Sequence, residues 1–266
     1  MTTRPDPCYD GSMTTNRELA EAGEIIRIVN GSRLYGTFQE DSDHDYIAIY
    51  VEPAEIVFSD RKIERSLLHD RNPEERNVDG GIDGIGYSLR HFIKLALDGN
   101  PSILTALFST EKFWPYHDEA GRMLMASSAD FASMKAAPRF KGYMKSQLER
   151  LQGIKTGHIP NRPWLVEKYG YDTKYAMSVA RLCMQGIEYF SFGTIESPMD
   201  EDDIDFLMRI RNGEFTYDET IAHILRLETS MHETIAEAEL PEEPNYAHIY
   251  YLSQEIHQLK WELING

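Results

Sequence analysis

The run of residues 46–51 (YIAIYV) carries apolar side chains at both its odd and its even positions. Successive side chains of a strand point to opposite faces, so a strand with this pattern is covered on both faces. A second β-branched run, residues 24–29 (EIIRIV), precedes it and ends abruptly at Asn30-Gly31-Ser32. We therefore predict a sheet in which residues 46–51 form a central strand.

Most of the remaining chain has helical periodicity. A short helix is expected at 15–22, and a turn-rich stretch at 70–81 leads into a short strand at 81–85. Helical spacing begins at Ser88, and everything after about residue 115 is expected to be helix, including residues 138–151, 172–190 and 246–264. Further helices are predicted to begin at Asn100-Pro101 and at a capping box in residues 216–219. The predicted fold class is α+β, a small mixed β-sheet with flanking helices followed by an all-helical carboxy-terminal region.

The formal charge of -17 argues against a protein that coats long duplex DNA, because such binding depends on Lys and Arg. Residues 135–181 are an exception, with 10 basic and 3 acidic side chains. This segment consists either of solvated helix faces or of a site for a polyanion, such as a short RNA end.

No apolar run approaches the roughly 18 residues that a membrane span needs, and the polar first thirty residues do not resemble a signal peptide. The two cysteines, Cys8 and Cys183, form no disulfide framework and have no metal-site spacing. These features predict a cytoplasmic protein with no membrane partner.

Between the two predicted strands lie Gly31-Ser32 and the acidic group Asp43-His44-Asp45. On a strand Asp43 and Asp45 would face the same side, with Cα atoms roughly 6 to 7 Å apart. Their carboxylates would repel each other unless a cation lies between them, and Mg²⁺ prefers carboxylate oxygens combined with substrate phosphates. Gly31-Ser32 permits close approach of the backbone to a phosphate, beside a short helix that begins around Arg33.

The succession of strand, Gly-Ser, a spacer of about ten residues, Asp-x-Asp and apolar strand resembles the signature of the DNA polymerase beta-like nucleotidyltransferase superfamily. The strings GSRLYGTFQEDSDHDYIAIYV, LRHFIKLALDGNPSILTALF and KYGYDTKYAMSVARL are similar to one branch of it. That branch contains predicted nucleotidyltransferases of bacteria and phages that are sometimes linked to RNA repair. The resemblance covers roughly residues 24–260. With the sequence patterns it predicts a catalytic domain at 15–115 and a helical domain at 116–266 that closes over the nucleotide. Residues 1–14 are polar and without periodicity, which predicts a flexible tail.

The resemblance implies two Mg²⁺ (or Mn²⁺) ions bound by the catalytic residues Asp43 and Asp45. In the superfamily a third carboxylate follows on a later strand, and the resemblance assigns that place to Asp83, with Asp79 as the competitor. The sequence departs from the family pattern here, since glycines surround the position where a firm strand is expected. They are Gly80, Gly81, Gly84 and Gly86.

The residues predicted to bind the nucleotide lie in two groups. Phosphate contacts are expected from Gly31, Ser32 and Arg33. In the basic segment, either Lys168 or Lys174 covers the triphosphate with a tyrosine such as Tyr169 beneath the base, or these lysines are exposed and the tyrosines are packed.

The implied reaction transfers NMP from an NTP such as ATP to a hydroxyl of an RNA 3′-end, a protein or a small molecule, with release of pyrophosphate. The alternative is a catalytically inactive nucleotide- or RNA-binding module of the same fold.

The segment from Ser32 to Glu52 has three other interpretations. Residues 41–45 with Glu52 have the ligand spacing of a calcium-binding helix–loop–helix motif, but Tyr46 stands where that loop needs glycine. A merely solvated acidic loop does not account for the nearby Gly-Ser. Ser32 lacks the Gly-x-Ser-x-Gly spacing of a nucleophile elbow, so a phosphate contact is the better interpretation.

Overall fold

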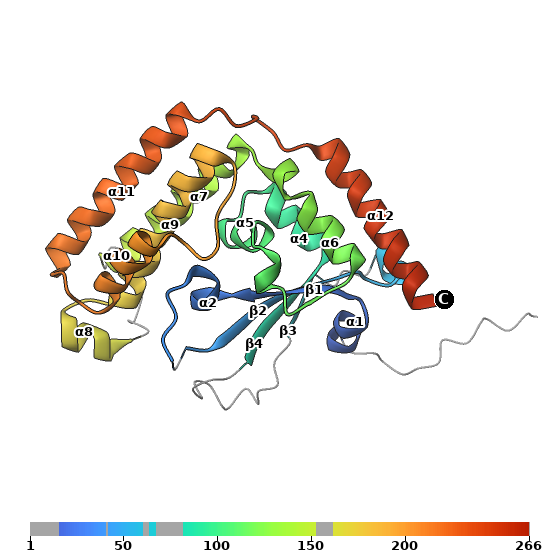
Figure 1. The fold of residues 1–266 in the computed structure, drawn as a ribbon, viewed down its shortest axis with the longest axis horizontal. Helices are drawn as coiled ribbons and strands as arrows, with labels where there is room; N and C mark the ends of the chain where they lie inside the picture. Colours follow the sequence, from blue (N-terminus) through green and yellow to red (C-terminus); the bar gives the residue numbers. More distant parts are fainter. Residues whose placement is uncertain (1–15, 41, 61–63, 68–81, 153–161, 266) are drawn as a thin grey trace, which may run out of the picture.

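A five-stranded mixed sheet forms the centre of the computed structural model, which describes residues 16–40, 42–60, 64–67, 82–152 and 162–265. The strand order is β3-β4-β2-β1-β5. The strands are β1 (Glu24–Asn30), β2 (His44–Tyr50), β3 (Arg65–Leu67), β4 (Ile82–Ser88) and β5 (Tyr116–His117). Helices surround the sheet (Figure 1), so the predicted α+β class is confirmed.

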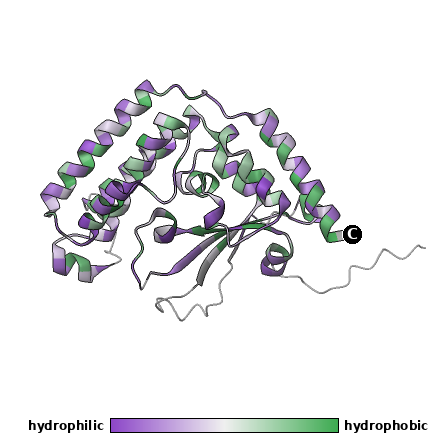
Figure 2. Ribbon diagram, viewed as in Figure 1, coloured by the Kyte–Doolittle hydropathy of each residue, from purple (hydrophilic) through white to green (hydrophobic). Residues whose placement is uncertain are grey.

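The central strand is β2, as predicted from its apolar residues on both faces. It pairs antiparallel with β1 and parallel with β4. Residues 47–50 of β2 are buried, and the apolar residues of the central strands are continuous in Figure 2. Strand β4 is longer than the segment predicted at 81–85, because pairing with β2 and β3 on its two sides supports a sequence of low strand propensity.

The predicted helices are all present, and their ends have the expected caps. Asn100 Oδ1 accepts from the backbone N–H of Ser102 at 3.1 Å, and Thr216 and Glu219 form a reciprocal capping box. The helices are α1 (Asn16–Ala22), α2 (Gly31–Tyr35), α3 (Ala54–Val57), α4 (Leu89–Leu97), α5 (Pro101–Leu107), α6 (Glu119–Ala126), α7 (Ala137–Leu151), α8 (Pro163–Tyr169), α9 (Thr173–Phe192), α10 (Glu201–Arg211), α11 (Tyr217–Glu237) and α12 (Tyr246–Asn265), with 3-10 turns at Glu111–Phe113, Ser128–Phe131 and Met134–Ala136.

The expectation that everything after residue 115 is helical is wrong at strand β5. Its two residues pair with Ile26 and Arg27 of β1, and the N–H of Asp118 donates to the carbonyl oxygen of Ile25 at 2.9 Å. A strand of two residues has no periodicity to detect, and it forms because the edge of β1 offers unpaired backbone groups. The domain boundary predicted between residues 115 and 116 stays a prediction. One hydrophobic core contains side chains from both of the predicted domains.

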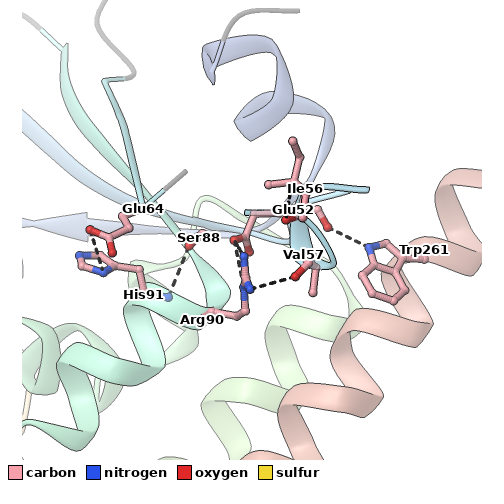
Figure 3. Close-up of polar contacts among 9 residues, drawn as sticks. Glu52, Ile56, Val57, Glu64, Ser88, Arg90, His91 and Trp261 are labelled. Carbon is pink, nitrogen blue, oxygen red and sulfur yellow. Dashed lines mark hydrogen bonds and ion pairs between the residues drawn. The ribbon is translucent and has the colours of Figure 1, made fainter. Parts of the chain in front are cut away.

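The end of β2 away from Asp45 is held by a buried carboxylate. Glu52 Oε1 accepts from Arg90 Nη2 at 2.8 Å, Arg90 Nη1 also donates to the carbonyl oxygen of Val57, and Trp261 Nε1 donates to the carbonyl oxygen of Glu52 (Figure 3). Asp45 and Glu52 lie at opposite ends of β2, roughly 20 Å apart. The calcium-binding helix–loop–helix interpretation needs both residues in one loop around one ion, so the strand at residues 44–50 excludes it.

The predicted tail at 1–14 and the loop at 70–81 lie outside the described residues. Within the part of the chain that the structure describes, no helix has the length and apolar character of a membrane span. Helices α11 and α12 follow each other in an arch over the molecule (Figure 1), and both carry mixed polar and apolar faces (Figure 2).

Lys260 fastens α12 to the sheet. The side chain is buried, and its Nζ donates to the carbonyl oxygen of Glu24 at 2.7 Å and to Asp118 Oδ2 at 2.9 Å. Asp118 also caps α6, because its Oδ1 accepts from the N–H of Gly121.

We predict that Lys260→Met lowers the free energy of unfolding by about 1–3 kcal/mol, because it leaves a buried carbonyl and a carboxylate without their donor. Lys94→Met, which removes an exposed i,i+4 partner of Asp98, is the control and should change stability by no more than about 0.5 kcal/mol. Urea denaturation measures both. Equal effects would show that the Lys260 contacts contribute nothing.

Candidate active site

The two aspartates predicted to bind metal lie at the start of the central strand. Asp45 is the second residue of β2 and pairs with Asn30, the last residue of β1. Asp43 stands just before the strand, and both side chains are partly exposed. The structure therefore places this acidic pair at the β2 entrance, beside the turn that contains Gly31-Ser32.

Gly31 lies directly against the carboxylate of Asp45. Its φ is +65°, and a Cβ at this position would be 2.3 Å from Asp45 Oδ2. A side chain there would displace the Asp45 carboxylate, and the positive φ also favours glycine. The position of this carboxylate is therefore a second reason for the glycine, besides the tight turn that the sequence indicated.

Arg33 supports the loop that leads to the aspartates. Its Nη2 donates to the carbonyl oxygen of Ser42 at 3.0 Å and its Nε to that of Asp43 at 3.4 Å. The guanidinium also lies 5.2 Å from the ring centroid of Phe38. The described contacts of Arg33 therefore position the Asp43 backbone, and its predicted contact with a nucleotide stays a prediction.

Asp83 occupies the place next to Asp45 on the neighbouring parallel strand. The two residues are register partners in β2 and β4, and neighbouring strands lie about 4.8 Å apart. The side chain of Asp83 and the whole of Asp79 lie outside the description. Among the side chains that are described, no group of three or more His, Cys, Asp or Glu could hold a metal ion.

Lys174 brings positive charge from helix α9 to the acidic pair. Loss of hydration lowers the pKa of Lys174, and the nearby cations Arg211 and Arg162 lower it further, whereas Asp43 and Asp45 act in the opposite direction. The side chain remains accessible to solvent. Lys174 is therefore close enough to sense both predicted metal ligands, and it belongs to a group of three cations.

The start of α9 fixes this group. Asp172 Oδ1 accepts from the N–H of Tyr175 at 2.9 Å and so caps the helix, while Asp172 Oδ2 pairs with Arg162 Nη1 at 3.2 Å. Arg181, farther along α9, lies 3.9 Å from the ring centroid of Tyr35 in α2. Helix α9 is thus joined to the same short helix that begins with Gly31.

Lys168 and Tyr169 have different surroundings. Lys168 Nζ lies 4.7 Å from the ring centroid of Tyr169, and a Cβ on Gly213 would meet that ring at 2.2 Å. In the part of the chain that is described, these contacts are with each other and with the α10–α11 turn. Lys174 is the one of these three residues for which the structure shows an effect of Asp43 and Asp45, while the predicted nucleotide contacts of Lys168 and Tyr169 stay predictions.

Arg211 is the residue of this site that sequence reasoning missed. It ends α10, a helix rich in Asp and Glu, so its local sequence gives no indication of an anion site. Its proximity to Lys174 arises only from the packing of α10 against α9.

A mixed sheet with an acidic pair at the start of its central strand is the arrangement that the resemblance to polymerase beta-like nucleotidyltransferases implies. Residues 16–259 match the RNA repair pathway DNA polymerase beta family, and the chain belongs to that family. It is also similar to an uncharacterized 38.9 kDa protein encoded in the nrdC–mobD intergenic region of Enterobacteria phage T4, with 36% identity over 139 residues. That match spans 51% of this chain and 40% of the phage protein. No solved structure matches the chain.

We predict that Gly31→Ala displaces the Asp45 carboxylate and abolishes the stabilisation of the protein by Mn²⁺ with NTP. Gly170→Ala is the matched control, because Gly170 also has a positive φ, +83°, but a Cβ there would meet nothing within 4 Å. Both changes should cost about 1–2 kcal/mol of backbone strain. A thermal shift with Mn²⁺ and NTP should be retained only in Gly170→Ala, and its retention in both variants would contradict the proposed role of the contact.

Proposed function

We propose that this chain transfers a nucleoside monophosphate from an NTP to a hydroxyl acceptor and releases pyrophosphate. In this reaction the acceptor oxygen bonds to the α-phosphorus, the bond from that phosphorus to the pyrophosphate oxygen breaks, and the hydroxyl proton is lost. One observation carries the proposal. Asp45 lies against Gly31, and Asp43 and Asp45 together are near enough to Lys174, from another part of the chain, to act on its pKa. Family membership supports the same reaction class and a role in RNA repair.

The donor set suits a hard divalent cation. Asp43 and Asp45 supply carboxylate oxygens at one strand entrance, and Asp83 stands at the neighbouring register position. Such oxygens are the ligands that Mg²⁺ and Mn²⁺ prefer. We propose that these three residues hold two ions, which when bound neutralise charge on the triphosphate and lower the pKa of the acceptor hydroxyl.

The cations of the helical region would bind the phosphates. Lys174, Arg162 and Arg211 lie close enough for each arginine to lower the pKa of the lysine, so they create a positive potential next to the acidic pair. A triphosphate placed between the two groups would relieve the repulsion within each of them. The work of these residues is positioning and charge neutralisation, which is the main protein contribution to phosphoryl transfer.

We predict that Asp45→Asn lowers pyrophosphate release by about 100-fold or more, while the free energy of unfolding stays equal or rises because repulsion from Asp43 is relieved. The assay contains Mn²⁺, one of the four NTPs and total cellular RNA or extract. Asp205→Asn, an exposed aspartate of α10, is the matched control and should retain activity. Full activity of Asp45→Asn would refute the metal site. Binding of NTP by the native protein without turnover under any acceptor would instead identify an inactive binding module.

We also predict different effects for the two lysines. Lys174→Met should raise the KM for NTP, with a smaller effect at high salt because screening masks the lost charge. The same change should leave the free protein equally or more stable at neutral pH. The pKa of Lys174 is lowered in the folded state, so its charged form costs stability below that pKa and the cost disappears as pH rises through it.

Lys168→Met is the control for this comparison, because Lys168 lies over the ring of Tyr169 on α8, a different helix from that of Lys174. Its KM should stay close to the native value. An equal rise of KM in the two variants would contradict the assignment of Lys174, and unchanged KM values in both would remove the helical cations from the nucleotide site.

A further inference from the structure

Helix α7 presents a basic, pocketed face that the proposed nucleotide site does not use. Its sequence, APRFKGYMKSQLERL, contains one acidic residue, Glu149. The four basic side chains are all exposed, and they are Arg139, Lys141, Lys145 and Arg150. In a chain of net charge -17 this helix is a local concentration of positive charge.

A pocket of about 490 Å³ opens on this face between two of the arginines. Arg139 and Arg150 line it together with Tyr143 and Gln147. Tyr143 is 39% exposed, and its hydroxyl oxygen accepts from Asn100 Nδ2, which holds the ring in place. Arg139 also pairs with Asp98 at the end of α4, with its Nη2 3.6 Å from Asp98 Oδ2. The pocket therefore combines a partly exposed aromatic ring with two arginines, one of which is paired with a carboxylate.

Gly142 lies in the same pocket, in the interior of α7. A glycine inside a helix is destabilising relative to alanine, and a Cβ on Gly142 would meet nothing within 4 Å. Packing against the described residues therefore does not require a glycine here. The glycine leaves the pocket open to a ligand, because a larger side chain at this position would occupy it.

The pocketed face leads toward the candidate active site. Phe140, near the start of α7, packs on Tyr189 and Phe190, near the end of α9. Because α9 ends at Phe192, α7 can pack along it only by running antiparallel, toward the α9 start where Lys174 lies. Figure 1 shows the two helices side by side. Arg150, in the last turn of α7, is therefore on the side of the nucleotide site.

We propose that α7 binds a single-stranded RNA, with one base in the pocket beside Gly142 and the backbone phosphates along the exposed arginines and lysines. Base stacking on an aromatic side chain and cations along the phosphates are the two requirements for binding single strands. The inference deepens the proposed function: it rests on nucleotidyl transfer in RNA repair and assigns a binding face for the RNA on α7.

The test measures fluorescence anisotropy of a labelled single-stranded RNA of about 12 nucleotides, without metal or NTP. Gly142→Leu, which fills the pocket without a change of charge, should weaken binding about 10-fold or more. Gly142→Ala is the size control and should bind more tightly than Gly142→Leu. Circular dichroism should show both variants folded, because the added atoms enter open space.

Two matched charge-reversal variants test whether the positive charge of α7 contributes to RNA binding. Arg150→Glu should weaken RNA binding and reduce the slope of log Kd against log salt by about 0.7 or more. Arg226→Glu makes the same change on α11, where Arg226 is exposed, and should leave both quantities near the native values. Equal losses in the two variants would mean that only net charge matters, and would overturn the proposal.

Two further outcomes would overturn the proposal. The native protein would fail to bind the RNA, or the Gly142→Leu variant would bind it as tightly as the native protein does. Stabilisation by Mn²⁺ with NTP, measured in parallel, should be retained in every α7 variant. If an α7 variant keeps this stabilisation but loses RNA binding, the result supports the assignment of the RNA to α7. Its absence in native protein would refute the nucleotide site independently of the RNA result.

Discussion

The contact between Gly31 and the Asp45 carboxylate determines how the site is built. It joins the turn after β1 to the start of β2, which pair antiparallel with Asn30 opposite Asp45. A side chain at position 31 would push the Asp45 carboxylate away from the turn, and the positive φ of this residue also favours glycine. The acidic group and the Gly-Ser backbone therefore occupy one location, which is the condition for placing a phosphate next to a carboxylate-bound metal.

Charge at this location links the helical region to the sheet. Asp43 and Asp45 lie at the start of β2, and both act on the pKa of Lys174 near the start of α9. Arg162 and Arg211 act on the pKa of the same lysine, and Arg162 is paired with Asp172. Arg181 of α9 also lies over the ring of Tyr35 in α2, the short helix that begins with Gly31.

Local patterns made much of this fold predictable. The central strand followed from its two-sided apolar run, and the helices from caps such as Asn100. Strand β5 could not be predicted, because two residues have no period. The site was only partly predictable: Asp43, Asp45 and Gly31 are close in sequence, whereas the proximity of Arg211 to Lys174 depends on how α10 packs. Asp83 entered through a family resemblance, and its register with Asp45 supports the position.

The most direct test of the central claim is a crystal structure with Mn²⁺ and a non-hydrolysable NTP analogue, with anomalous scattering used to locate the metal. The account predicts manganese bound by the carboxylates of Asp43, Asp45 and Asp83, with the triphosphate extending toward Lys174, Arg162 and Arg211. Manganese bound elsewhere, or a triphosphate that does not approach Lys174, would contradict it.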